Sequence, residues 1–157
     1  MSKPYKDFEP KWVKTPAPKD SYRSIFRWGD PKYVKYPKES LYKMMKQIFN
    51  MTDEDFSSYD GDIGMDSVKL DAPCNLGEEH IEAMKKIAGE EFVTTEDYPR
   101  LAVAYGKTGY DAARLRQRII ENLPDVVVYP GTTKQIEEIV AYCTKHGIPL
   151  YVYGGGS

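Results

Sequence analysis

The amino-acid sequence predicts an α+β protein in which a helical, aromatic-rich N-terminal region precedes a βαβ unit. Apolar residues recur at the spacing of an α-helix in two segments of the middle of the chain, residues 41–49 and 78–88. Near the C-terminus, two short apolar runs at 126–129 and 150–153 flank a third segment with helical spacing. With 157 residues, the chain has room for one domain, or for one domain with an extension.

Residues 1–40 are rich in proline, aromatic residues and positive charge. They contain 10 basic and 5 acidic side chains, and their six prolines interrupt any long helix. Eight aromatic side chains are more than a disordered tail usually carries, which favours an extended arm whose rings pack on a larger body. An arm that binds a partner protein is the alternative. RNA binding is disfavoured because the sequence contains no recognisable RNA-binding motif.

The segment 41–49 predicts the first clear helix. Five apolar residues form one stripe along it, which we expect to be core: Leu41, Met44, Met45, Ile48 and Phe49. Asn50 is suited to end this helix. Thr52, with Asp55 three residues later, is suited to begin a short second helix.

A further helix is predicted from Glu78 to Ala88. Its buried stripe would consist of Ile81, Met84, Ile87 and Ala88. The first turn is acidic and the last turn is basic, which matches the helix dipole, and Gly89 is suited to end the helix.

An acidic loop with Asp60, Asp62 and Asp66 lies between these helices and suggests a calcium site. An EF-hand loop that begins at Asp60 would need glycine at its position 6 and glutamate at its position 12. The sequence has Met65 and Asp71 there instead. We therefore expect a solvated acidic loop and no metal site.

The last third of the chain predicts a helix over about residues 110–120, followed by strand, helix and strand. Pro130 and Gly131 turn the chain after the strand at 126–129, and Gly147 ends the next helix. The apolar stripe of that helix consists of Ile136, Ile139, Val140 and Cys143. Because a helix joins the two strands through short turns, we expect the strands to be parallel.

Composition excludes several classes of protein. The net charge of -2 lacks the basic excess that a generic nucleic-acid binder carries. No apolar run approaches the ~20 residues that span a bilayer, and no apolar stretch follows the first residues as in a secretory signal. The two cysteines, Cys74 and Cys143, are expected to be free thiols in a reducing cytoplasm.

Gly154, Gly155, Gly156 and Ser157 directly follow the second predicted strand. Consecutive glycines let several main-chain N–H groups converge on one anion, and the serine hydroxyl adds a donor. Such a loop at the carboxyl end of a parallel strand can hold a diphosphate. It is not a P-loop, because no Gly-Lys-Ser/Thr follows at the required spacing. Taken alone, the glycine run is equally compatible with a flexible tail or a linker.

Four sequence parts in order carry a resemblance to a known family. They are the strand PDVVVYP, an amphipathic helix, the second strand in HGIPLYVYGGGS, and the glycine loop. Together they resemble the opening of the FAD-binding domain of the vanillyl-alcohol-oxidase/PCMH flavoprotein superfamily. Upstream, Arg27-Trp28-Gly29-Asp30 and Asp97-Tyr98-Pro99-Arg100 resemble segments of the alkyldihydroxyacetonephosphate (alkylglycerone-phosphate) synthases.

The resemblance implies that residues 99–157 begin a PCMH-type FAD-binding domain and that residues 1–98 form an N-terminal extension. It implies FAD as the cofactor, with its diphosphate held mainly by main-chain groups of Val152, Tyr153, Gly154, Gly155, Gly156 and Ser157. The implied reaction exchanges the acyl chain of acyl-dihydroxyacetone phosphate for a fatty alcohol, in ether lipid synthesis, with no net redox change.

Two other functions stay open. An FAD-linked 2-hydroxy-acid dehydrogenase, of the glycolate or D-lactate type, shares the same glycine loop. A non-catalytic interaction module could instead be built from the aromatic arm and the acidic middle. No catalytic residue is assigned, because the resemblance implies that the catalytic residues lie beyond residue 157. We expect His80 at the surface and His146 as a cap at a helix C-terminus.

Members of the family are several hundred residues longer than this chain. We therefore expect an N-terminal fragment of an enzyme that binds FAD weakly on its own; a subunit completed by another chain is the alternative. The implied lipid substrates favour a cytoplasmic enzyme peripheral to a membrane, and a homodimer is compatible with the sequence.

Overall fold

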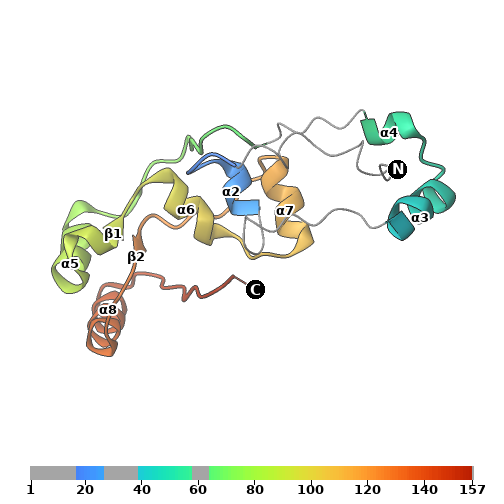
Figure 1. The fold of residues 1–157 in the computed structure, drawn as a ribbon. Helices are drawn as coiled ribbons and strands as arrows, with labels where there is room; N and C mark the ends of the chain where they lie inside the picture. The colour runs from blue at the N-terminus through green and yellow to red at the C-terminus, as the bar shows by residue number, and fades with distance from the viewer. Residues whose placement is uncertain (1–16, 27–38, 58–63, 157) are drawn as a thin grey trace. The chain divides into compact units, whose positions relative to one another are not determined.

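A computed structural model describes residues 17–26, 39–57 and 64–156 (Figure 1). The chain divides into two compact units, residues 1–67 and residues 68–157. The sequence places a functional boundary elsewhere, between residues 98 and 99, and that boundary stays a prediction. Most of the aromatic arm, the Arg27–Asp30 segment, Asp60, Asp62 and Ser157 lie outside the described residues.

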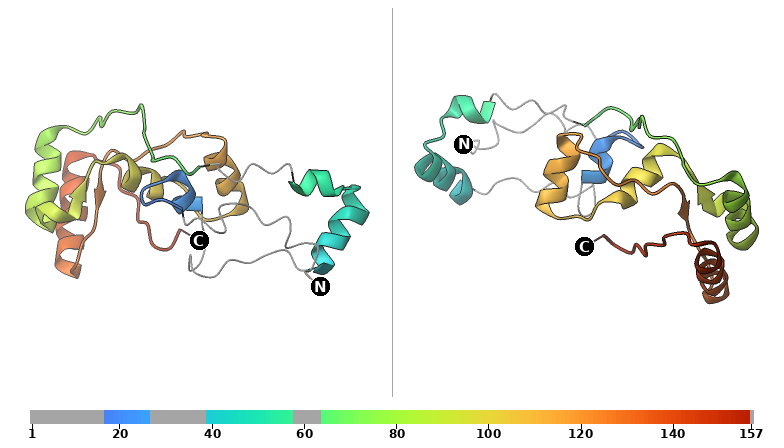
Figure 2. Two further views of the ribbon diagram at one scale, coloured as in Figure 1. Left: turned by 45° about the horizontal axis from the view of Figure 1, so that its top comes forward. Right: turned by 180° about the vertical axis from the view of Figure 1, so that it is seen from behind.

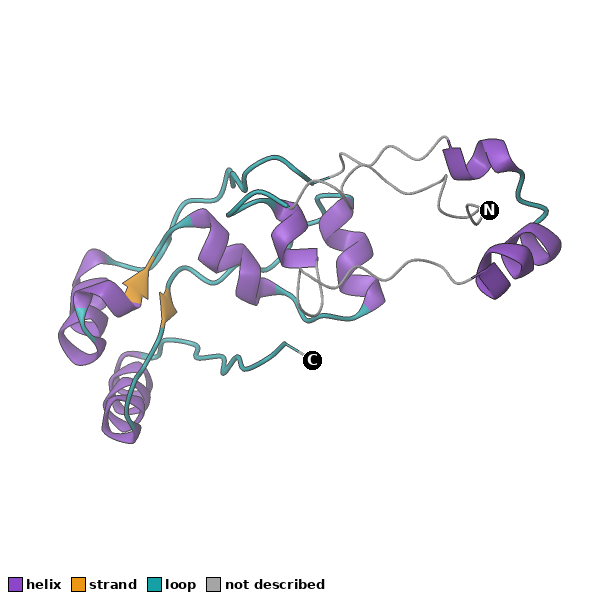
Figure 3. Ribbon diagram, viewed as in Figure 1, coloured by secondary structure: helices purple, strands orange, loops and turns teal. Residues whose placement is uncertain are grey.

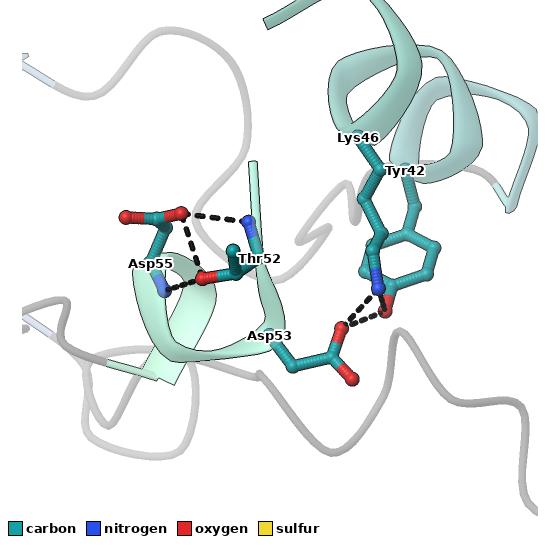
Figure 4. A network of polar contacts seen from close by, with 5 residues as sticks. All are labelled: Tyr42, Lys46, Thr52, Asp53 and Asp55. Carbon is teal, nitrogen blue, oxygen red and sulfur yellow. Dashed lines mark hydrogen bonds and ion pairs between the residues drawn. The ribbon is translucent and has the colours of Figure 1, made fainter. Parts of the chain in front are cut away.

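The first unit contains three described helices, α2 (Tyr22–Phe26), α3 (Glu39–Phe49) and α4 (Asp53–Ser57). The predicted helix over 41–49 is confirmed, and it ends where expected, because Asn50 adopts a left-handed φ of 52°. The predicted start of the next helix is confirmed too. The Thr52 main-chain N–H and hydroxyl both donate to the Asp55 carboxylate, and the Asp55 N–H donates back to the Thr52 hydroxyl (Figure 4).

The predicted core stripe of α3 is wrong. Four of its five residues are exposed large apolar side chains: Leu41, Met44, Ile48 and Phe49. The buried residue of α3 is Tyr42, whose ring lies 4.8 Å from the ring of Phe56 on α4. The short helix α4 contacts the side of α3 that carries Tyr42, and so the apolar stripe is left uncovered by the described residues of this unit.

The second unit contains a larger set of elements: α5 (Glu78–Ala88), η2 (Glu90–Phe92), β1 (Val93–Thr94), α6 (Asp97–Ala104), α7 (Gly109–Arg116), β2 (Val127–Val128) and α8 (Thr133–His146). Helices α5 and α8 lie side by side in Figure 1 and in both views of Figure 2. The hydrophobic core lies between them, and its buried members are Ile81, Met84, Ala88, Val93, Ile139 and Cys143.

The core confirms most of the predicted stripe of α5 and half of that of α8. Ile136 and Val140, predicted to be core, are exposed in α8. Both cysteines are free thiols as predicted, and Cys143 is buried.

Both ends of α8 follow their local sequence signals. The Thr132 hydroxyl accepts from the Gln135 N–H, and Gly147 ends α8 with a left-handed φ of 65°. Helix α7 stops at Arg116, before the predicted end near residue 120, because Arg118 also adopts a left-handed φ of 58°. Helix α6 was not predicted as an element; its proline, Pro99, lies in the first turn, where proline is tolerated.

The sheet consists of two short strands, β1 and β2, which are antiparallel (Figure 3). Val93 pairs with Val128, and Thr94 pairs with Val127. The predicted strand at 126–129 is therefore present in its two middle residues, Val127 and Val128, and helices with a small sheet make the chain α+β as expected. The βαβ unit is not confirmed. Residues 150–153 follow α8 as a loop, because no described strand offers them a pairing partner (Figure 3).

Candidate cofactor-binding site

The glycine loop, defined here as Tyr153–Gly156, follows an exposed segment after α8 that has no regular secondary structure. The side chains of Tyr151 and Val152 are 89% and 97% exposed. A Cβ atom added at Gly154 or Gly155 would meet no other atom within 4 Å. The main chain of these two glycines is therefore open to an approaching ligand.

The main-chain donors of this region are available for binding. Within residues 17–26, 39–57 and 64–156, none of the N–H groups of Val152 through Gly156 donates a hydrogen bond. Consecutive N–H groups without competing side chains suit a diphosphate, which carries several acceptor oxygens and negative charge. Five of the six residues predicted to bind FAD thus have main chains that fit the group, and the sixth, Ser157, lies outside the described residues.

The glycine loop is attached to the connection between α6 and α7. The Lys107 N–H donates to the Gly156 carbonyl over 2.6 Å. The Tyr153 hydroxyl lies 3.1 Å from the Tyr105 carbonyl and 3.3 Å from the Ala102 carbonyl, and donates to them. Sequence reasoning did not foresee these partners, because contacts between residues about 50 positions apart leave no local pattern.

A carboxylate also lies close to this connection. Asp111 accepts from the hydroxyl and N–H of Thr108 and so closes the capping box of α7. Burial is the main cause that raises the pKa of the Tyr153 phenol above its ordinary 10.0, and the charge of Asp111 raises this pKa further. The phenol is therefore protonated at neutral pH and serves as a donor.

The two histidines lie close together, with ring centroids 5.3 Å apart. His146 is at the C-terminus of α8 as predicted, whereas His80, expected at the surface, is partly buried. The side chain of His80, on α5, is 22% exposed, and its Nδ1 lies 3.0 Å from the Tyr142 hydroxyl on α8. Tyr142 in turn stacks on His146 in the last turn of α8, with ring centroids 4.3 Å apart. These rings contribute to packing between α5 and α8, and no catalytic role is assigned to either histidine.

Comparison with known proteins identifies the C-terminal part of the chain. Residues 124–157 match the family described as FAD binding domain. These residues belong to an FAD-binding domain. Its cofactor is FAD, and the FAD-binding segment begins at Pro124, three residues before β2, and includes α8 and the glycine loop. The resemblance to the flavoprotein superfamily is thereby confirmed.

Relatives align with most of this chain. Protein Rv2250A of Mycobacterium tuberculosis is 30% identical over 104 residues, which are 66% of this chain and 66% of that protein. Two alkyldihydroxyacetonephosphate synthases, from Trypanosoma brucei brucei and Dictyostelium discoideum, are each 22% identical over 146 and 131 residues. These alignments cover 83% and 81% of this chain but 24% and 21% of the synthases.

The chain therefore spans about a quarter or less of the synthases that it matches. No solved structure matches it. In the part of the chain that the structure describes, no helix is both long and apolar enough to cross a membrane. The FAD-binding segment and the synthase relatives together support an FAD-dependent enzyme family.

Proposed function

We propose that the glycine loop and Val152 bind the diphosphate of FAD through their main-chain N–H groups, with the Ser157 hydroxyl as a further donor. The observation that carries this proposal is the open main chain of Gly154 and Gly155 within the FAD-binding segment. Main-chain donors are well suited to a diphosphate, because several of them can approach its oxygens at once.

We further propose that the enzyme exchanges the acyl chain of acyl-dihydroxyacetone phosphate for a fatty alcohol, which releases a fatty acid. Support comes from the synthases named above, whose similarity extends over both units of this chain and not over the FAD-binding segment alone. FAD, when bound, supplies the reactive ring system for such chemistry. The residues described here bind and orient it through the diphosphate, and the substrate-binding and catalytic groups are not assigned.

The diphosphate site is tested by titration of the ¹⁵N-labelled chain with three ligands. NMR detects weak binding at each amide separately, which suits the low affinity that we expect. FAD and ADP, which carry a diphosphate, should shift the N–H signals of Val152 through Gly156, whereas riboflavin, which has none, should leave them unchanged. Absence of any shift at millimolar FAD would overturn the proposed site.

Two alanine variants sharpen this test. In Gly155→Ala, the new methyl group meets no protein atom but lies where the ligand approaches, so FAD affinity should fall roughly tenfold while stability is unchanged. Gly109→Ala is the matched control, because this glycine also has no atom within 4 Å of an added Cβ and lies outside the FAD-binding segment. Its affinity for FAD should equal that of the wild type.

The reaction is tested with the protein isolated from its native host. Acyl-dihydroxyacetone phosphate and a labelled fatty alcohol should yield a labelled ether lipid and one free fatty acid per product. Glycolate and D-lactate are offered in parallel with a redox dye. Dye reduction without any ether product would instead identify a hydroxy-acid dehydrogenase.

A further inference from the structure

The side chain of Tyr153 is 38% exposed, and its hydroxyl reaches the C-terminal end of α6. Its hydroxyl donates toward the carbonyl oxygens of Ala102 and Tyr105, at 3.3 Å and 3.1 Å. Ala102 is among the last four residues of α6, and Tyr105 is the C-cap. Carbonyls at these positions have no partner within the helix, so the phenol supplies a donor that the helix end lacks.

A second contact holds the other end of the glycine loop. The Lys107 N–H donates to the Gly156 carbonyl over 2.6 Å. Gly106 permits this approach, since a Cβ atom there would lie 3.0 Å from that carbonyl oxygen. Gly156 permits the Tyr153 contact in turn, because a Cβ atom at Gly156 would overlap the phenol hydroxyl.

The segment that receives the loop is itself held in place. We call residues 102–107 the platform. The Tyr105 hydroxyl donates to the Ile119 carbonyl over 2.6 Å and accepts from the Glu121 N–H over 3.1 Å. The guanidinium of Arg114 lies 5.7 Å from the Tyr105 ring centroid and forms an ion pair with Glu121. The platform is therefore anchored to the chain that leads into the FAD-binding segment.

We propose that Tyr153 is a positioning residue that fastens the glycine loop to the platform and so orders the loop's N–H groups before FAD binds. The part of this proposal that concerns FAD rests on the proposed function, whereas the fastening does not. Tyr153 acts here through its hydroxyl on the platform, while its main-chain N–H stays available to the ligand. An ordered loop loses less conformational entropy on binding, which raises affinity.

Hydrogen exchange at one amide tests the fastening without any ligand. The Lys107 N–H donates to Gly156, so its exchange rate reports whether the loop is seated on the platform. In Tyr153→Phe, which removes only the hydroxyl, Lys107 should exchange roughly three- to tenfold faster. The matched control is Tyr151→Phe, because Tyr151 is 89% exposed and none of the hydrogen bonds of the described residues involves it. In Tyr151→Phe, the Lys107 N–H should exchange at the wild-type rate.

The results that would overturn the fastening are equally direct. The fastening is overturned if the Lys107 N–H exchanges at the same rate in Tyr153→Phe and in the wild type. It is also overturned if this N–H is not protected from exchange in the wild type. The slow amides in the middle of α8 report the fold and should not change in either variant. Gly106→Ala is the second variant: its new methyl group would crowd the Gly156 carbonyl and should also speed exchange at Lys107.

The FAD titration then tests the positioning role. Tyr153→Phe should bind FAD roughly three- to tenfold more weakly than the wild type and than Tyr151→Phe. If Tyr153→Phe exchanges faster at Lys107 but binds FAD as tightly as the wild type, Tyr153 fastens the loop without positioning it for FAD. If the wild-type chain does not bind FAD at all, the proposed function is overturned, and so is the positioning role of Tyr153. The exchange rate of the Lys107 N–H would still show whether Tyr153 fastens the loop to the platform.

Discussion

Arg100 Nε donates to the Pro124 carbonyl over 2.8 Å and joins α6 to the first residue of the FAD-binding segment. The same guanidinium donates to the carbonyls of Ala72, over 2.9 Å, and Pro73, over 3.5 Å. The Arg100 side chain is only 4% exposed, and Asp97 lies 4.0 Å away as its counter-charge. A single buried arginine thus connects three stretches of the second unit.

Replacing Arg100 by lysine should destabilise the second unit. An ammonium group cannot present the planar fork of donors that three separate carbonyls require, so some of them would be left without a donor. We expect a loss of about 2–3 kcal/mol in the free energy of unfolding. Urea denaturation followed by circular dichroism measures it. Arg116→Lys, at an exposed position on α7, is the control and should stay within about 0.5 kcal/mol of the wild type.

Gln135 connects the N-terminus of α8 to the C-terminus of α5. Its Oε1 accepts from the N–H groups of Gly131 and Thr132, and its Nε2 donates to the carbonyls of Ile87 and Ala88. Gln135→Ala removes all four contacts and should cost about 1–2 kcal/mol of stability.

Thermal unfolding of Gln135→Ala can be compared with that of Gln117→Ala, an exposed glutamine after α7. Gln135→Glu separates the two halves of the contact. It keeps an acceptor for the helix N–H groups but places negative charge against the α5 carbonyls. A Gln135→Glu chain as stable as the wild type would show that the contact with α5 contributes nothing.

Gly156 is the glycine of the loop that cannot accept a side chain in the free protein. Its φ is +73°, and a Cβ atom would overlap the Tyr153 hydroxyl. Gly156→Ala should therefore cost about 1 kcal/mol and release the loop from Lys107. Gly155→Ala, where a Cβ atom has free space, should keep wild-type stability in urea denaturation. Equal stability of both variants would contradict the described loop conformation.

The contact between α3 and α4 should respond to acid. The hydrogen bond from Lys46, followed by that from the Tyr42 hydroxyl, lowers the pKa of Asp53 below its ordinary 3.8 (Figure 4). Since the unfolded chain binds this proton more readily, the contact stabilises the fold above about pH 3.8. This stabilisation is lost as the pH falls through the lower, folded-state pKa.

Carboxyl ¹³C shifts report the titration of Asp53 directly. Lys46→Gln should raise the pKa of Asp53 toward its ordinary value, because the first cause of the lowered pKa is removed. Lys43→Gln is the matched control, since Lys43 pairs with Glu39 over 3.0 Å. If the pKa of Asp53 is the same in Lys46→Gln as in the wild type, the ion pair between Lys46 and Asp53 is contradicted.

The two thiols should differ in reactivity. Cys143 lies in the core between α5 and α8, and its burial raises the pKa of the thiol above the ordinary 9.0. Because the thiolate is the reactive form, Cys143 should react slowly with a thiol reagent in the folded chain and quickly in urea. Cys74 is only partly buried and should account for the fast phase. Cys74→Ser should remove this fast phase, and a fast phase that persists would contradict the buried position of Cys143.

Local signals in the sequence determined several of the helices and their ends. The bounds of α5, the capping boxes at Thr52 and Thr132, and the left-handed Gly147 all follow from a few neighbouring residues. The open main chain of Gly154 and Gly155 follows equally from their missing Cβ atoms. These features are predictable because the groups that stabilise them lie within one helical turn.

Tertiary structure alone decided which strands pair, which side chains are buried, and which residues the glycine loop contacts. A strand exists only where another main chain pairs with it, so Val127–Val128 is a strand beside β1 and residues 150–153 are not. The amphipathic stripe of α3 is exposed because burial depends on what covers a face, which periodicity cannot tell. Tyr153 meets the end of α6 across about 50 residues of chain, a distance at which sequence carries no local signal.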